Sequence, residues 1–196
     1  MIGPVSIASG QELVCQRGDL PSGVVEGVIL ACPRQDGPSL IDEGLEFKVR
    51  ILRPNGTPIS GIPATDIWLR SNESICGGRI LIPNGPTDQY GITSFVGSLR
   101  AGGCEESQMY IMVRRNGRDL ILVENPATCT PPVRVPVRVV SPDIDADGDV
   151  DSVDREKFDD IYYSGSYHEC ADYNGDGSVD NEDLLIFEQH MGHVCS

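Results

Sequence analysis

Two aspartate-rich segments near the C-terminal end constrain this chain more than any other feature of its sequence. In residues 143–154, oxygen-bearing side chains occupy positions 1, 3, 5, 7, 9 and 12, and glycine occupies position 6; residues 172–183 repeat the pattern 29 residues later. Calcium takes six to eight oxygen ligands, and a twelve-residue loop supplies them from these positions, with glycine at its sharp turn. The spacing therefore predicts two bound calcium ions, one in each loop.

The predicted ligands are Asp143, Asp145, Asp147, Asp149, Asp151 and Asp154 in the first loop, and Asp172, Asn174, Asp176, Ser178, Asp180 and Asp183 in the second. Many acidic runs are only solvated segments. Here, aspartates crowded into one short loop repel one another by about 1–4 kcal/mol per close pair. A folded loop therefore needs a counter-ion, and magnesium is a poorer candidate because it keeps more of its waters.

The acidic residues are concentrated in the part of the chain that contains the loops. Residues 1–142 carry 14 acidic and 13 basic side chains, whereas residues 143–196 carry 16 acidic and 2 basic ones. A chain of this net charge is not attracted to a phosphate backbone or an anionic membrane, and it has no apolar run of the length that spans a bilayer. We therefore expect neither nucleic acid nor membrane insertion, and a cation as the favoured partner.

Residues 1–141 have the alternating pattern of half-buried strands. Apolar and charged residues alternate from Leu45 to Ile51, and Asn116-Gly117 is a hairpin signal between two short apolar runs. About eight strands with frequent turns predict a mainly β fold, an immunoglobulin-like β-sandwich, with a barrel as the alternative.

A change of composition at Ser141-Pro142 predicts the boundary of a second domain, residues 142–196. Before it, Pro136 restricts residues 133–140 to an edge strand, because proline cannot donate to a sheet ladder. After it, helical spacing of apolar residues predicts a short helix behind each loop. At position 8 of the loops, Val150 and Val179 are expected to form a short strand pair and share a core.

The arrangement of the loops resembles a known family. An ordinary EF-hand has a helix on both sides of its loop and usually a glutamate at position 12, whereas here position 12 is aspartate and prolines exclude an entering helix. A loop with an exiting helix, present twice, resembles the dockerin modules of secreted and cell-surface bacterial proteins. The resemblance covers residues 143–194 and implies two calcium ions and docking onto a cohesin domain. The residues at the docking positions, 10 and 11 of each loop, are Ser152, Val153, Asn181 and Glu182.

The first domain resembles bacterial immunoglobulin-like surface domains through residues 47–61 (FKVRILRPNGTPISG) and 87–95 (TDQYGITSF). That resemblance implies a spacer or adhesion role rather than catalysis. Within it, Cys76 and Cys104 flank a strand unit and are expected to form a disulfide.

Seven cysteines without a C-x-x-C pair indicate disulfides in an exported protein. Cys170 and Cys195 bracket the second loop and its helix, which predicts a bridge between them, and Cys15, Cys32 and Cys129 have no assigned partner. The three histidines, His168, His190 and His193, are interpreted as surface residues rather than a zinc site, because the last two are expected at the fraying end of a helix and no cysteine or carboxylate completes tetrahedral geometry with them.

The sequence predicts no enzyme. It has no G-x-S-x-G motif, no histidine before His168 and no phosphate-binding glycine loop. We expect an extracellular or cell-surface calcium-binding structural protein that assembles with copies of itself into a fibre or surface layer, with residues 3–8 as a strand added to a neighbour's sheet. The alternatives are docking onto a cohesin-bearing scaffold and a non-catalytic part of a secreted carbohydrate-active enzyme.

Overall fold

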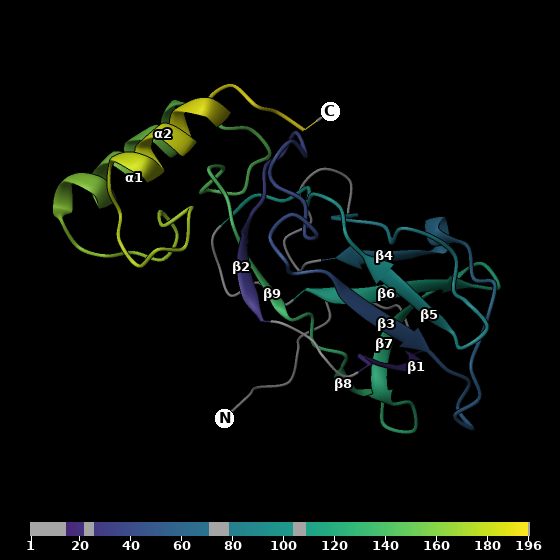
Figure 1. The fold of residues 1–196 in the computed structure, drawn as a ribbon. Helices are drawn as coiled ribbons and strands as arrows, with labels where there is room; N and C mark the ends of the chain where they lie inside the picture. Colours follow the sequence, from purple (N-terminus) through teal and green to yellow (C-terminus); the bar gives the residue numbers. More distant parts are fainter. Residues whose placement is uncertain (1–14, 22–25, 71–78, 104–108, 196) are drawn as a thin grey trace.

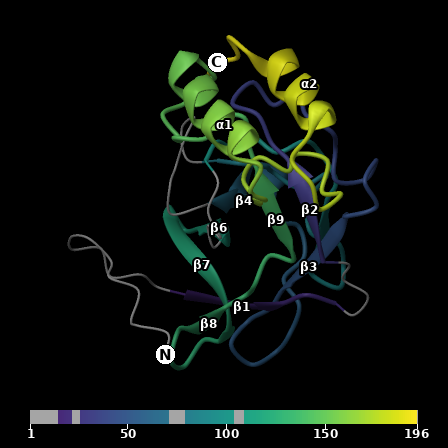
Figure 2. The same ribbon diagram turned by 90° about the vertical axis from the view of Figure 1, so that its left-hand side faces the viewer.

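The computed structural model describes residues 15–21, 26–70, 79–103 and 109–195, and it has two parts (Figures 1 and 2). Most strands form a larger body, and two helices lie together at one end of it. The elements are β1 (Cys15–Asp19), β2 (Gly27–Leu30), β3 (Phe47–Ile51), the 3-10 helix η1 (Ala64–Asp66), β4 (Ile67–Arg70), β5 (Ile92–Phe95), β6 (Tyr110–Arg115), β7 (Arg118–Asn125), β8 (Thr130–Pro132), β9 (Val137–Val140), α1 (Ser152–Ser164) and α2 (Asn181–His190). The mainly β fold expected from the sequence is confirmed.

The strands of the body follow one hydrogen-bonded path, in the order β4-β6-β7-β1-β3-β5, with β8 beside β7. Strand β1 pairs in parallel with β7 through its first residues and antiparallel with β3 through its last two. At Gly18 in β1, a Cβ would lie 2.6 Å from the side chain of Leu122 in β7, so glycine permits this close approach. One short strand thus joins two ladders.

The expected hairpin and the expected strand from Leu45 are both present. Strands β6 and β7 are antiparallel neighbours, and the turn residues Asn116 and Gly117 have φ values of 52° and 74°, the left-handed region that this pair favours. In β3, Phe47, Val49 and Ile51 are buried while the residues between them are more exposed. Period-two patterning therefore predicted these elements correctly.

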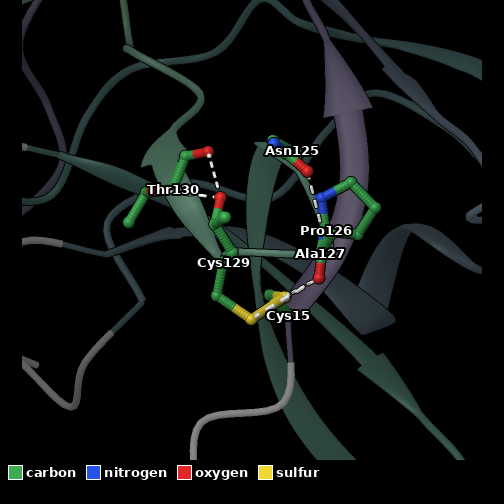
Figure 3. The surroundings of a disulfide bond; sticks show 7 residues. Cys15, Asn125, Pro126, Ala127, Cys129 and Thr130 are labelled. Atoms are coloured by element: carbon green, nitrogen blue, oxygen red, sulfur yellow. Dashed lines mark hydrogen bonds between the residues drawn. A yellow bond between two sulfur atoms is a disulfide. The ribbon is translucent and has the colours of Figure 1, made fainter.

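A disulfide joins Cys15 at the start of β1 to Cys129 in the turn between β7 and β8 (Figure 3). In the same turn, the side chain of Asn125 accepts a hydrogen bond from the Ala127 amide at 3.0 Å. The bridge spans 114 residues of sequence, so it ties together the two ends of the body. Cys32 is a free, buried cysteine, and the predicted Cys76–Cys104 bridge lies outside the described residues.

Strands β2 and β9 form a separate parallel ribbon, and this ribbon connects the two parts of the molecule. Neighbouring residues of a strand face opposite sides. On one side, Ile29 and Val139 belong to the core of the body; on the other, Leu30 and Val140 pack with the helices. The ribbon is therefore shared by two cores. The strand predicted over residues 133–140 begins only at Val137.

The predicted domain boundary lies in a buried segment. Ser141 is fully buried, and its hydroxyl donates to the carbonyl of Ala101 at 3.3 Å. The amide of Gly103 donates to the carbonyl of Asp143, the first residue of the first loop. These contacts fix the start of the loop to the body, so the joint is not an exposed linker.

The two predicted helices are confirmed, and they enclose a small aromatic core. The ring of Phe158 in α1 stacks on those of Tyr173 and Phe187, with centroids 5.8 and 5.0 Å apart. The hydroxyl of Tyr162 donates to the side chain of Asn181 at 2.7 Å, which links α1 to the start of α2. Among the described residues, no helix has the length and apolar character needed to cross a bilayer.

Candidate metal centre

The first loop follows directly from strand β9 and wraps around the carboxylate of its first residue. Asp143 is fully buried, and its two oxygens accept hydrogen bonds from the amides of Asp147 and Gly148, each at 3.1 Å. Gly148 has a φ of 101°, a conformation that favours glycine and permits the turn at position 6. The sequence pattern therefore corresponds to a loop folded around its first carboxylate.

The last predicted ligand closes the loop and also begins the helix. Asp154 accepts hydrogen bonds from the amides of Ile144 at 2.7 Å and Asp151 at 2.9 Å. Asp151 is in turn the N-cap residue of α1, with Asp154 as the third helical residue, so the two form a reciprocal capping box. This double use explains why an exiting helix follows the loop without a spacer.

The second loop repeats this hydrogen-bond network with the same offset of 29 residues. Asp172 accepts from the amides of Asp176 at 3.1 Å and Gly177 at 3.0 Å. Asp183 accepts from the amide of Tyr173 at 2.7 Å, and α2 begins with the same kind of capping box. Two segments with one spacing have thus adopted one backbone fold.

The structure brings the carboxylates of the first loop together in two groups. The ligand oxygens of Asp143, Asp145 and Asp147 lie within 4.8 Å of one another, as do those of Asp149, Asp151 and Asp154. In the second loop, Asp176 accepts from the amide of Ser178 at 2.9 Å, and the Asn174 side chain donates to Asp176 at 3.0 Å. Every predicted ligand therefore lies in a loop folded around its first carboxylate.

Two carboxylate oxygens of the first loop are buried without a hydrogen-bond partner. They are Oδ1 of Asp145 and Oδ1 of Asp149. The other oxygen of Asp145 lies 3.1 Å from the ammonium of Lys157. Leaving a buried carboxylate oxygen unsatisfied is costly, and a hard cation satisfies such oxygens directly. The donor set of this loop therefore fits calcium.

Burial and mutual repulsion raise the pKa values of carboxyl groups in the loops and so favour their protonated form. Burial, with the nearby charge of Asp154, raises the pKa of Asp143 to about 7. Burial is also the main cause of the raised pKa values of Asp154 and Asp183. Carboxylates held in such surroundings favour any partner that neutralises them, and a divalent cation competes with protons for the same oxygens.

The expected strand pair between the loops is not found among the described residues. Val150 exchanges backbone hydrogen bonds with the C-terminal segment instead, donating to His193 and accepting from Gly192, each at 2.8 Å. Val150 and Val179 do share one apolar cluster. The shared core was predicted correctly, whereas the pairing was wrong because the chain after α2 returns along the first loop.

The return of the chain along the first loop also bears on the predicted bridge between Cys170 and Cys195. Cys170 and Cys195 are both disulfide-bonded, yet the predicted bridge between them is not found among the disulfides that join two described residues. The amide of Cys195 donates to the carbonyl of Gly148 at 2.9 Å, so this cysteine lies along the first loop. Proximity in sequence to the second loop was therefore a poor guide.

Sequence reasoning misjudged two of the histidines. His190 is buried, and His193 lies between it and Cys32, which follows strand β2. Burial raises the pKa of Cys32 to about 12 and lowers the pKa of His190, so that both are uncharged at neutral pH. Asp36 supplies a carboxylate to the same cluster of side chains. The separation of more than 150 residues hid this cluster from motif searching.

The residues at the docking positions are all accessible. Ser152, Val153, Asn181 and Glu182 are exposed at the starts of the two helices. Comparison with known protein families and with curated proteins found no match.

Proposed function

We propose that residues 143–183 hold two calcium ions in a dockerin-like module, and that the chain is an extracellular or cell-surface, non-catalytic structural protein. In the first loop, the side chains of Asp143, Asp145, Asp147 and Asp154 would hold the ion, with the carbonyl of Asp149 and a water on Asp151. In the second, the side chains of Asp172, Asn174, Asp176 and Asp183 would do so, with the carbonyl of Ser178 and a water on Asp180.

One observation carries the calcium proposal: the orphaned side-chain oxygen of Asp145 lies in a loop whose hydrogen-bond network recurs 29 residues later. A solvated acidic tail has no reason to repeat a network of this kind. A bound ion neutralises the crowded carboxylates and satisfies the buried oxygen of Asp145, which is the role that calcium plays in such loops.

Calcium would also stiffen the connection between the two parts. The carbonyl of Asp143 already accepts from Gly103 in the body, and Val150 is bonded to the C-terminal segment. An ion held by Asp143 therefore acts on the residue that fixes the loop to the body. The body itself we take to be an immunoglobulin-like sandwich, in which β1 would be the strand shared between the two sheets.

The proposed role of the module is assembly with a protein partner. Its exposed apolar side chains include Val153 and Leu185, which are 46% and 57% accessible. Residues 1–142 carry 13 basic side chains against 14 acidic ones, so this part offers the acidic residues 143–196 of another copy a nearly neutral surface rather than a strongly repelling one. Docking onto a cohesin domain through the starts of α1 and α2 is the second candidate.

Calcium titration of the full chain by calorimetry tests the core of the proposal. Wild-type protein is expected to bind two ions, and Asp143→Ala and Asp172→Ala are each expected to remove one. Asp160→Ala is the matched control, because Asp160 is an exposed carboxylate on α1 outside the loops. No binding heat in the wild-type protein contradicts the proposal.

Light scattering with calcium and then with chelator tests the assembly. Oligomers that form in calcium and dissociate in chelator support contact between copies. Monomers at all concentrations in calcium contradict it, and capture by an isolated cohesin domain then identifies the second candidate. Measurable hydrolysis of a glycan contradicts the non-catalytic role.

A further inference from the structure

Four side chains that are far apart in sequence converge between the body and the helices. They are Cys32, Asp36, His190 and His193, and one ligand atom from each lies within 4.8 Å of the other three. Cys32 is fully buried, and His190 is 8% accessible. None of these residues belongs to the two aspartate loops.

Backbone contacts hold both halves of the cluster in place independently of their side chains. On the body side, Ala31 donates to Val140 at 2.8 Å, and the turn closed by Gln35 and Cys32 at 2.9 Å carries Asp36. On the helical side, the amide of His193 donates to the carbonyl of His190, the last residue of α2, at 3.0 Å. The convergence is therefore built into the fold.

Hydrogen bonding alone does not account for the arrangement. Nδ1 of His193 lies 3.1 Å from the sulfur of Cys32, 3.2 Å from Nδ1 of His190 and 3.3 Å from Oδ1 of Asp36. An imidazole nitrogen has either one proton or one lone pair, so it forms a hydrogen bond with one of these three atoms. A single ion at the centre of the cluster satisfies all four ligand atoms together.

The separations agree with a tetrahedral centre. Zinc binds cysteine sulfur at about 2.3 Å and histidine nitrogen or carboxylate oxygen at about 2.0–2.2 Å, which places neighbouring ligand atoms about 3.3–3.7 Å apart. The distance from Nδ1 of His190 to Oδ1 of Asp36 is 3.8 Å, that from Nδ1 of His193 to Oδ1 of Asp36 is 3.3 Å, and the other two are 3.1 and 3.2 Å, slightly shorter than this range. Small side-chain rotations bring all four atoms to bonding distance.

We propose that Cys32, Asp36, His190 and His193 bind one zinc ion that clamps the body to the end of α2. One sulfur, two nitrogens and one oxygen form a donor set that selects zinc over calcium, which prefers oxygen alone. On binding, the Cys32 thiol releases its proton to solvent and becomes the thiolate ligand, and both imidazoles bind through Nδ1. Thiolate and carboxylate together neutralise the charge of the ion at a site in which Cys32 and His190 are buried and Asp36 is exposed.

Zinc titration of the full chain, saturated with calcium and kept free of thiol reductant, tests this site. We expect one zinc ion per chain that excess calcium does not displace. Cys32→Ser and His193→Ala are expected to weaken zinc binding by about 100-fold or more, since the affinity of a structural site is divided among four ligands. His168→Ala is the matched control, because His168 is exposed and distant from the cluster in sequence, and it is expected to leave the affinity unchanged.

Cobalt in place of zinc gives a second, spectroscopic readout of the ligand set. A tetrahedral site with a thiolate is expected to give intense visible d–d bands and a sulfur-to-cobalt charge-transfer band, and Cys32→Ser is expected to lose the latter. Zinc that calcium displaces, or that Cys32→Ser binds as tightly as wild type, contradicts the proposal by placing the ion in the aspartate loops. Because calcium and zinc occupy different residues, failure of one proposal leaves the other standing.

Discussion

The body and the helical part are stabilised in different ways. The body has a large apolar core that draws on most of its strands and a disulfide across 114 residues. The helical part has a small aromatic core, and much of its chain consists of loops in which carboxylates bind backbone amides. We expect a small region with buried like charges to depend on a counter-ion for its stability, and we expect the body not to do so.

Removal of calcium should have the largest effect, and it should be confined to the helical part. At a thousandfold excess over its dissociation constant, each ion stabilises the folded form by about 4 kcal/mol. Hydrogen exchange followed by mass spectrometry should show protection lost over residues 143–183 in chelator and retained in β3, β6 and β7. Magnesium is the control and should not restore the protection. Equal loss of protection in both parts would show that the body depends on calcium as much as the helical part does.

Removal of the Cys15–Cys129 bridge should destabilise the body and leave the helical part unchanged. Closing a loop of roughly 100 residues stabilises a protein by about 4–5 kcal/mol, so Cys15→Ser with Cys129→Ser should lower the free energy of unfolding of the body by up to this amount. Denaturant unfolding measures the loss, and calorimetry should still find two calcium ions. A changed calcium stoichiometry would show that the two parts are less independent than their cores indicate.

Two adjacent residues of β9 give a matched test of the shared ribbon. Val139 faces the core of the body and Val140 faces the helices, and both are buried. Each valine-to-alanine change should cost about 2 kcal/mol through lost burial and the cavity left behind. Region-resolved hydrogen exchange should place the loss from Val139→Ala in the body and that from Val140→Ala in the helical part. Identical profiles would mean that the ribbon unites both cores into one cooperative unit.

The smallest expected effect is a dependence on pH. It has opposite signs for the stability of the calcium-free protein and for the affinity for calcium. Because the folded pKa of Asp143, about 7, is above its unfolded value, its contribution to the stability of the calcium-free protein is greatest below about pH 4 and is lost as the pH rises through 7. Calcium displaces that proton, so its affinity at the first loop should instead increase about tenfold from pH 6 to pH 8.

Calorimetry at these two pH values measures the change, and Asp143→Asn, which has no carboxyl proton at this position, is the control. An affinity that does not change between pH 6 and pH 8 would show that protons do not compete at this carboxylate.

The elements that the sequence predicted well are those held by contacts within a few residues. The capping boxes of α1 and α2 join residues three positions apart, and the β6–β7 hairpin follows from Asn116-Gly117. The carboxylate of Asp143 reaches amides four and five residues ahead. Spacing alone is informative at this range, because chain geometry brings such groups together whatever surrounds them.

The elements that the sequence missed depend on contacts across the whole chain. Val150 was expected to pair with Val179, and it pairs with the segment after α2. The cysteines without an assigned partner became a bridge, Cys15–Cys129, and a buried thiol at Cys32. No local signal selects among such partners, since each choice depends on how the body and helices pack.

The sequence by itself therefore determined the two loops, their helices and the predicted ligands, because every group in those networks lies within twelve residues of its partner. Only the tertiary structure decided that β2 and β9 lie side by side between two cores. The same packing brings Cys32 and Asp36 to His190 and His193. Burial of apolar surface on both faces of the ribbon fixes that geometry, and periodicity does not encode it.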